Sequence, residues 1–353
     1  MVYYVFAAIA TLFAYVYTKN RKRYKRSSKV FYFLSFLTYF IPAAIRYGIG
    51  QDYFYTYYPM FHSIRNGAYS IYTNMIIRYN EYGFTVFNKI VGFFTSDAQW
   101  IFVLTSLFCV GMAFKCIKDY SPNIPFSVFM LVLGSYYVGS YSLIRQSIAT
   151  VIFLFSIRYI KERKVIKYYI CTIIAILFHT AAIVYIPFYF IGNIKMEKKK
   201  YPFVAAVVVV VLMLSSTVVS YFVSMTRFVD RISSVSVGDN LALYLMVVLV
   251  FFVGLLGYTN EKDELYRVFL NAQLIAVCII GLSNLLQTTD RLIFTYYYIN
   301  FVSIPYFLKN GKFGRIRQFV VLGLIVALFA MWCFEHLYYD QYSILPYRTI
   351  FSR

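Results

Sequence analysis

The chain of 353 residues is 61% hydrophobic and only 14% charged, which excludes an ordinary soluble domain and indicates a polytopic helical membrane protein. Its apolar runs are continuous and not alternating, which argues against a transmembrane β-barrel. The net charge of +20 comes from short basic clusters between these runs. Such clusters are typical of cytoplasmic loops that face anionic lipid, so we expect no nucleic-acid partner.

Apolar runs of near-spanning length follow one another along the whole chain. A spanning helix needs about 17–25 residues. The runs lie at residues 2–18, 30–45, 98–117, 124–141, 143–160, 168–192, 202–224, 241–258, 266–287, 291–308 and 316–334. Residues 84–95 are too short to span and predict an amphipathic helix in the membrane interface. We expect a single integral membrane domain over residues 1–353, with a long extracytoplasmic loop at about 46–97.

Lysine and arginine residues set the predicted orientation, because short cytoplasmic loops carry an excess of them. Residues 20–29 hold six basic side chains, which places this loop inside and the following long loop outside. If residues 168–192 crossed the membrane once, the basic segments 195–200 and 309–317 would both lie outside. A segment 168–192 that enters and returns to the same side puts both segments inside.

The sequence offers a place for this reversal at Phe178, His179 and Thr180, where the apolar run is interrupted. The two arms on either side would each reach roughly 16–20 Å, only part of the way across a bilayer. Non-helical backbone at such depth needs protein or a cavity around it. We therefore expect an all-α polytopic membrane protein with about ten transmembrane helices plus a re-entrant or broken helix pair, with His179 near its tip.

The stretch from Arg46 to Tyr58 directly follows the second apolar run and gathers several chemically distinct groups. It contains one arginine, two glycines, Asp52 and six aromatic residues. Arginine presents a planar fork of donors that suits phosphate, an aspartate can accept a proton, and aromatic faces stack on sugar rings. An ordinary interface loop would also be rich in tyrosine, and both interpretations remain open.

Further charged residues collect on the predicted outer face. Arg145 and Arg291 each stand at the start of an apolar helix, and Glu81 lies in the long loop. An arginine in such a place can simply snorkel to lipid headgroups, and a histidine such as His179 can be a hydrogen-bonded structural residue. Arg65 lies in a polar part of the loop and is interpreted as solvated. Arginines together with aromatics on this face fit a lipid-linked anion that carries a glycan.

The cysteines and the recognisable motifs give no sign of a metal or a nucleotide. The five cysteines lie in or beside apolar segments without CxxC spacing, which is typical of small core residues. The sequence contains no HEXXH motif and no P-loop. We therefore expect neither a metal nor a cofactor.

Short motifs in a fixed order resemble the EpsG family of exopolysaccharide proteins, which is related to Wzy-type O-antigen and capsule polymerases. The resemblance extends from about residue 2 to residue 310 and departs from the family at Ala181, where serine is frequent. The motifs are Arg46–Tyr53, Glu81–Phe84, Ile144–Ala149, Phe178–Ala182 and, more loosely, Thr289–Arg291.

The resemblance implies a glycosyltransferase with a GT-C-like polysaccharide polymerase architecture in the bacterial cytoplasmic (inner) membrane, with its active face extracytoplasmic. Such an enzyme transfers the growing glycan from undecaprenyl pyrophosphate to the next lipid-linked repeat unit, without metal or nucleotide. A chain-length regulator and a flippase are the implied partners. The expected roles are pyrophosphate binding for Arg46, Arg145 and Arg291, glycan binding for Tyr53, Tyr55 and Tyr57, and general base for Asp52, Glu81 or His179.

Three alternatives remain at this point. A transporter or flippase of the same glycan lipid would also use arginines and broken helices, but it predicts charges along a path through the bilayer. The middle of most apolar runs here is free of charge, which favours an enzyme that works at one face. An O-antigen-ligase-like transferase would use the same donor, whereas a membrane acyltransferase would need a carboxylate beside its histidine, and His179 has none in its local sequence.

Overall fold

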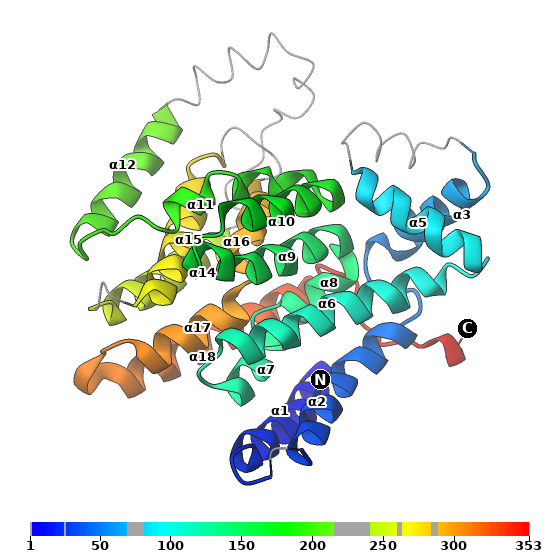
Figure 1. Ribbon diagram of the computed structural model, residues 1–353, viewed down its shortest axis with the longest axis horizontal. Coiled ribbons are helices and arrows are strands. Elements are labelled where there is room, and N and C mark those ends of the chain that lie inside the picture. The colour runs from blue at the N-terminus through cyan, green and yellow to red at the C-terminus, as the bar shows by residue number, and fades with distance from the viewer. Residues whose placement is uncertain are drawn as a thin grey trace.

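The computed structural model describes residues 2–24, 26–68, 81–214, 241–259, 263–283 and 289–352, and within these ranges the chain is helical with a single isolated β-bridge, between Arg46 and Thr349 (Figure 1). The N-terminal part contains α1 (Val2–Asn20), α2 (Ser28–Ile45), the π-helical turn η1 (Tyr53–Tyr57), α3 (Tyr58–Arg65), α5 (Tyr82–Phe94) and α6 (Gln99–Tyr120). The central part contains α7 (Ile124–Leu133), α8 (Tyr136–Ser142), α9 (Ile144–Lys161), α10 (Val165–Phe178), the 3₁₀ helix η2 (Thr180–Tyr185), α11 (Phe188–Ile191) and α12 (Lys200–Leu214). The C-terminal part contains α14 (Leu241–Gly257), α15 (Glu264–Ile280), α16 (Thr289–Tyr297), α17 (Asn300–Asn310), α18 (Arg317–Cys333) and η6 (Phe334–Tyr338).

Length and apolar composition identify the helices that can cross a membrane. Four of the described helical segments qualify, namely α1, α2, α6 and the segment Gly314–Tyr338 that contains α18. Counting the bent pair α7 and α8 as one span makes five, while α10 and α14 are shorter apolar helices. The expected all-α membrane protein is therefore confirmed.

Two of the expected apolar runs contain breaks that the hydrophobic pattern did not predict. α7 and α8 meet at an angle of 44°, where Ser135 adopts a left-handed backbone conformation with φ of 60°. The expected run 291–308 is divided between α16 and α17. The expected runs 202–224 and 266–287 extend beyond the described residues.

Residues 168–192 fold back on themselves. α10 ends at His179, whose extended backbone (φ −154°) leads into η2. The returning segment lies against the start of α10. The Tyr168 hydroxyl donates to the carbonyl of Tyr185 at 2.7 Å, and the Tyr169 hydroxyl donates to the carbonyl of Ile186 at 3.2 Å. His179 is therefore at the tip of a hairpin, as the charge pattern predicted.

Contacts between the basic turns bring both ends of this hairpin to one end of the molecule. Arg163, just before α10, donates to the side chain of Asn193, just after α11. Lys198 donates to the carbonyl of Leu256 at 2.7 Å, and the backbone N–H of Lys312 donates to the neighbouring carbonyl of Gly257 at 3.0 Å. The basic segments 161–167, 195–200 and 309–317 thus share one end of the helices.

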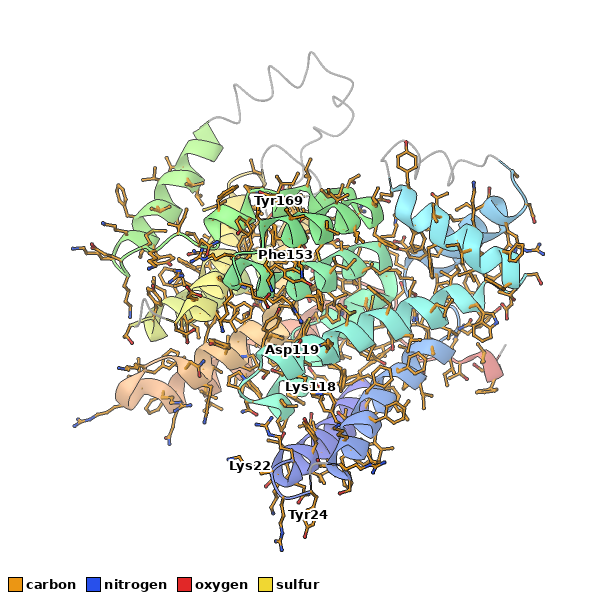
Figure 2. All side chains as sticks on the ribbon, viewed as in Figure 1. Lys22, Tyr24, Lys118, Asp119, Phe153 and Tyr169 are labelled. Carbon is orange, nitrogen blue, oxygen red and sulfur yellow. The ribbon has the colours of Figure 1, made fainter. Side chains whose placement is uncertain are left out.

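Buried tyrosines bind the helices together, because each supplies a large apolar ring and a donor for a main-chain carbonyl. In a membrane, main-chain carbonyls cannot bond to water, so they need hydrogen-bond donors from within the protein. Tyr39 on α2 donates to Val128 of α7 at 2.9 Å, and Tyr185 of η2 donates to Thr295 of α16 at 2.9 Å. Phe153, labelled in Figure 2, stacks on the Tyr185 ring with centroids 3.9 Å apart. The returning arm of the hairpin is thereby fixed against α9 and α16.

The first long loop packs closely against the end of α8, just before α9. Gly50 has a φ of +105°, and a Cβ there would lie 2.6 Å from the carbonyl oxygen of Tyr141, so only glycine fits without a shift. The next backbone N–H, of Gln51, donates to the Ser142 hydroxyl at 2.9 Å and to the carbonyl of Tyr342 at 3.0 Å. This docking carries the residues after Gly50 towards Arg145.

Candidate functional site

Glu81 is the centre of a polar cluster built from three separate parts of the chain. Its Oε1 lies 2.8 Å from Nδ1 of His179 and accepts a hydrogen bond from the backbone N–H of Thr180 at 3.3 Å. Its Oε2 pairs with the guanidinium of Arg145. The structure therefore brings together the long loop, the hairpin tip and the start of α9. Each of these three parts contains one of the sequence motifs.

Close packing of α5 on α10 makes this cluster possible. Glu81 immediately precedes α5, and a Cβ on Gly83 would lie 2.9 Å from the carbonyl oxygen of Leu177 near the end of α10. Any larger residue would hold the two helices apart at this point. Glycine at position 83 therefore allows the short side chain of Glu81 to reach His179.

The cluster is largely removed from solvent, so its charges interact strongly. The Glu81 side chain is 3% exposed, that of His179 11% and that of Arg145 19%. Burial by itself would raise the pKa of Glu81, but the hydrogen bond with His179 and the charge of Arg145 outweigh it and lower the pKa. Glu81 is accordingly an ionised acceptor and a weak base.

The histidine has one ring nitrogen left for chemistry. Because the carboxylate of Glu81 only accepts hydrogen bonds, Nδ1 of neutral His179 carries the proton and Nε2 carries the lone pair. Nε2 is buried and has no hydrogen-bond partner among the described residues. A carboxylate that orients an imidazole with a free basic nitrogen is the arrangement used for general-base catalysis.

Further cationic and acidic side chains lie near Arg145 and His179. The Arg145 guanidinium lies over the Tyr57 ring, 5.9 Å from its centroid. Asp52, whose carboxylate accepts a hydrogen bond from Thr56 at 3.2 Å, is close enough to act electrostatically on Arg145. Arg291 is exposed and acts electrostatically on His179.

Gln146 ties α9 to α16, because its side-chain amide donates to the carbonyl of Arg291 at 2.6 Å. Gln146, Thr180 and Gly83 are site residues to which the sequence analysis gave no role, although all three lie within the quoted motifs. Only their positions within these motifs could have identified them, because their residue types alone do not distinguish them from other glycines, threonines and glutamines.

Arg46 lies elsewhere, in a separate buried site. Its side chain is 1% exposed, donates to the carbonyl of Ala43 and to the Ser106 hydroxyl, and lies 4.4 Å from the centroid of the Tyr141 ring. Tyr53 packs nearby, stacked on Phe102 with its hydroxyl donating to Gln99 at 2.7 Å. The structure thus does not bring Arg46 or Tyr53 together with Arg145.

The other two tyrosines expected to bind glycan differ in accessibility. Tyr55 is 76% exposed, whereas Tyr57 is 2% exposed and donates to the carbonyl of Ser142 at 3.2 Å. Tyr55 is therefore accessible from outside, and the Tyr57 ring lies beneath the Arg145 guanidinium.

A second buried histidine cluster, which the sequence analysis did not predict, lies at the bend between α7 and α8. Nε2 of His336 lies 3.2 Å from the Ser135 hydroxyl and 3.8 Å from the carboxylate of Glu335. Both partners approach the same nitrogen, so the group cannot pass a proton from serine through histidine to glutamate. It is a buried polar contact that joins η6 to the bend.

No group of three or more His, Cys, Asp or Glu side chains within the described ranges could hold a metal ion. Comparisons with curated proteins and with solved structures find no match. The family model described as the EpsG family matches residues 29–349, which is nearly the whole chain. The chain therefore belongs to the EpsG family.

Proposed function

We propose that this protein is a polymerase of lipid-linked oligosaccharide repeat units, such as those of O-antigen, capsule or exopolysaccharide. In this proposal it transfers the growing glycan from undecaprenyl pyrophosphate to the next repeat unit at the outer face of the inner membrane. Membership of the EpsG family supports a polysaccharide polymerase role in general. The observation that carries the specific proposal is the free Nε2 of His179, oriented by Glu81 beside Arg145.

The arginines would bind the leaving group. Arg145 uses one edge of its guanidinium for Glu81, which leaves further N–H donors for a phosphate. Arg291 would add a second positive charge from the start of α16. Negative charge grows on the pyrophosphate as the sugar–phosphate bond breaks, and fixed cations at that position stabilise the transition state.

His179 would serve as the base. Its Nε2 takes the proton of the acceptor hydroxyl while that oxygen forms a bond to the anomeric carbon of the donor glycan. The bond from the anomeric carbon to the pyrophosphate oxygen breaks, and its electron pair leaves with the pyrophosphate. One direct displacement of this kind inverts the anomeric configuration. Glu81 stabilises the imidazolium that results, and it therefore acts as a positioning residue.

The remaining candidates take lesser or different roles in this proposal. Asp52 is the second candidate base, because it is half-buried and near Arg145. Arg46 and Tyr53 support the fold of the long loop, and Tyr55 contacts glycan. The proposed whole has about ten transmembrane helices in a GT-C-like arrangement, with a chain-length regulator and a flippase as partners.

Glu81 beside His179 supplies the carboxylate that a membrane acyltransferase would need, so the donor, acyl or glycosyl, has to separate that alternative from a polymerase. The other two alternatives predict a different distribution of charge or a different acceptor. A flippase needs polar groups along a path through the membrane, whereas the cluster of Glu81, Arg145 and His179 is confined to one end of α9 and α10. An O-antigen-ligase-like transferase would use the same base and the same donor. The product separates the two enzymes, since a ligase does not extend one repeat unit with another.

The test compares purified variants on a synthetic lipid-linked repeat unit and measures polymer length and released undecaprenyl pyrophosphate. His179→Gln should abolish polymer, because glutamine keeps a hydrogen bond but cannot take the proton. Glu81→Gln should be nearly as inactive, and Asp52→Asn less so. His62→Gln, on α3, is the matched control and should polymerise normally.

The outcomes reassign or reject the mechanism. Normal polymer from His179→Gln together with none from Asp52→Asn would move the base to Asp52. If all three variants polymerise normally, the acceptor hydroxyl needs no protein base and the mechanism is wrong. A deletion strain that lacks the repeat unit on the outer face, instead of accumulating single units there, would favour the flippase.

A further inference from the structure

A second basic site lies apart from the cluster around Glu81. A cavity of about 540 Å³ opens between α3 and α5 and contains two cationic side chains. Its lining residues are Ile64, Arg65, Gly67, Lys89, Gly92 and Phe93. We name it the Arg65–Lys89 pocket. Among the described residues Arg65 forms one side-chain hydrogen bond, to its neighbour Asn66 at 3.5 Å, and neither cation forms an ion pair with a carboxylate.

The helix that forms one wall of the pocket has an exposed apolar face. α5 buries Phe84, Asn88 and Val91 against the protein. Its opposite side presents Phe93 and Phe94, which are 84% and 79% exposed, together with Val86 and Ile90 at 53% and 55%. A helix with this pattern lies in the membrane interface with its apolar face in lipid.

Two cations beside such a face lie at the depth of lipid phosphates. Uncompensated Arg and Lys side chains at this depth bind phosphate through charge-assisted hydrogen bonds. The pocket is open towards solvent and has an exposed aromatic ring in its wall, Phe93, which an isoprenoid chain can cover. Its chemistry therefore suits the phosphate group of a lipid.

The position of the pocket along α5 separates it from the reacting centre. Lys89 follows Glu81 by eight residues, which corresponds to about 12 Å along a helix. The donor pyrophosphate is bonded to the carbon that reacts, so it must lie beside His179. The acceptor pyrophosphate is separated from the reacting hydroxyl by the whole repeat unit. A phosphate site at a distance from the base thus fits the acceptor and not the donor.

We propose that the Arg65–Lys89 pocket binds the pyrophosphate of the lipid-linked acceptor, so that the repeat unit extends from this pocket to His179. This inference rests on the proposed polymerase function. The donor pyrophosphate then lies at Arg145, near the start of α5. The acceptor pyrophosphate lies at Arg65 and Lys89, beside a later part of the same helix. Arg65, interpreted as solvated from the sequence, gains a binding role.

The experiment uses substrates of which each can serve either as the donor or as the acceptor, but not as both. The donor is a lipid-linked repeat unit whose acceptor hydroxyl is replaced by hydrogen. The two acceptors are a lipid-linked unit with a non-cleavable phosphonate in place of the sugar–phosphate bond, and the same oligosaccharide without lipid or phosphate. The full-length protein in nanodiscs is assayed for the single-addition product with each acceptor.

The wild-type protein should use the lipid-linked acceptor far better than the free oligosaccharide. In Arg65→Ala/Lys89→Ala the ratio of the two rates should fall about tenfold or more, as expected for the loss of hydrogen bonds to a charged group. Lys22→Ala/Lys118→Ala is the matched control, because both side chains are exposed and lie away from α3 and α5 (Figure 2), and it should keep the wild-type ratio.

Two results would overturn the assignment. One is an unaltered ratio in Arg65→Ala/Lys89→Ala. The other is an equal loss with both acceptors that appears only in nanodiscs containing phosphatidylglycerol, which would identify an ordinary phospholipid headgroup as the ligand. If the wild type transfers nothing to either acceptor, the polymerase proposal fails. The pocket is then judged by binding of the phosphonate acceptor alone, which the double variant should weaken to the same extent.

Discussion

At the scale of single residues, Glu81 is the group on which the arrangement depends. One buried carboxylate satisfies both the guanidinium of Arg145 and the imidazole of His179. Removing it leaves a partly buried cation without its partner, and the cost of about 3–5 kcal/mol known for fully buried pairs is an upper bound here. The same substitution therefore affects both stability and chemistry, and the two effects have to be measured separately.

The lowered pKa of Glu81 leads to a stability prediction. A carboxyl group whose pKa is depressed by folding stabilises the protein above its unfolded pKa, about 4.3, and this contribution disappears as pH falls through the folded pKa. Wild type should therefore melt several degrees above Glu81→Gln at neutral pH, and the difference should close only below about pH 4. Thermal unfolding in detergent measures it. Glu162→Gln removes an exposed carboxylate whose pair with Lys164 is screened by solvent, so it should show a much smaller difference.

Arg145 gives a prediction about catalysis. Arg145→Lys should be nearly as damaging as Arg145→Ala, because an ammonium cannot hold Glu81 and a phosphate with the same planar fork. We expect a loss of about 2–4 kcal/mol of transition-state stabilisation, seen as a fall in kcat/KM on a lipid-linked repeat unit. Full polymerisation by the lysine variant, at normal protein level, would reduce Arg145 to an interface anchor.

The sequence predicted some residues of this site well and others poorly, for a physical reason. Arg145 was identified because a charged side chain at the start of an apolar run is rare, and His179 because it interrupts such a run. Glu81 was identified as a carboxylate in the long loop on the predicted outer face. The burial of Arg46 could not be predicted, because it depends on Ser106 and Tyr141, which are distant in sequence. For the same reason the role of Glu81 as an orienting group, and not a base, required its partners to be known.

At the scale of elements, the contact between α5 and α10 decides whether the base is oriented. Gly83→Ala would place a Cβ within 2.9 Å of the Leu177 carbonyl, so the helices must separate and Glu81 must draw away from His179. A displacement of about 1 Å can reduce a rate by about 100-fold. We expect a large loss of polymer with protein levels close to normal.

Gly323→Ala on α18 is the control for this substitution, because a Cβ there meets nothing within 4 Å. It should leave polymerisation intact, since alanine also suits a helix interior. Equal activity of the two alanine variants would show that the approach of α5 to α10 has no part in the reaction.

The hairpin of α10 and η2 shows what charge distribution contributes to fold prediction. Hydrophobicity alone makes residues 168–192 one apolar segment, and only the positions of basic residues indicated a reversal. The bend between α7 and α8 had no comparable signal. It depends on local backbone geometry at Ser135 and on the contact with His336, a residue 201 positions away.

At the scale of the whole molecule, the shared end of the basic turns gives a topology prediction. In a background without the five native cysteines, single cysteines at Lys198 and Lys312 should resist a membrane-impermeant thiol reagent in intact cells. A cysteine at Ser96, which is exposed between α5 and α6, should react. Reaction at Lys198 with protection at Ser96 would invert the proposed orientation and place the site inside. Residues 225–240, a further loop expected on the outer face, lie outside the described residues.

We infer above that α5 lies in the membrane interface, and such a position has a consequence for the response of the protein to its lipid environment. Glu81 is carried by a helix whose height follows the bilayer surface, whereas His179 is fixed by the helix bundle through Tyr185. A thinner or thicker bilayer shifts the first relative to the second. Polymerisation should therefore pass through an optimum as acyl-chain length is varied in reconstituted vesicles. Shortening or lengthening the lipids would then slow the reaction without any change in the amino-acid sequence.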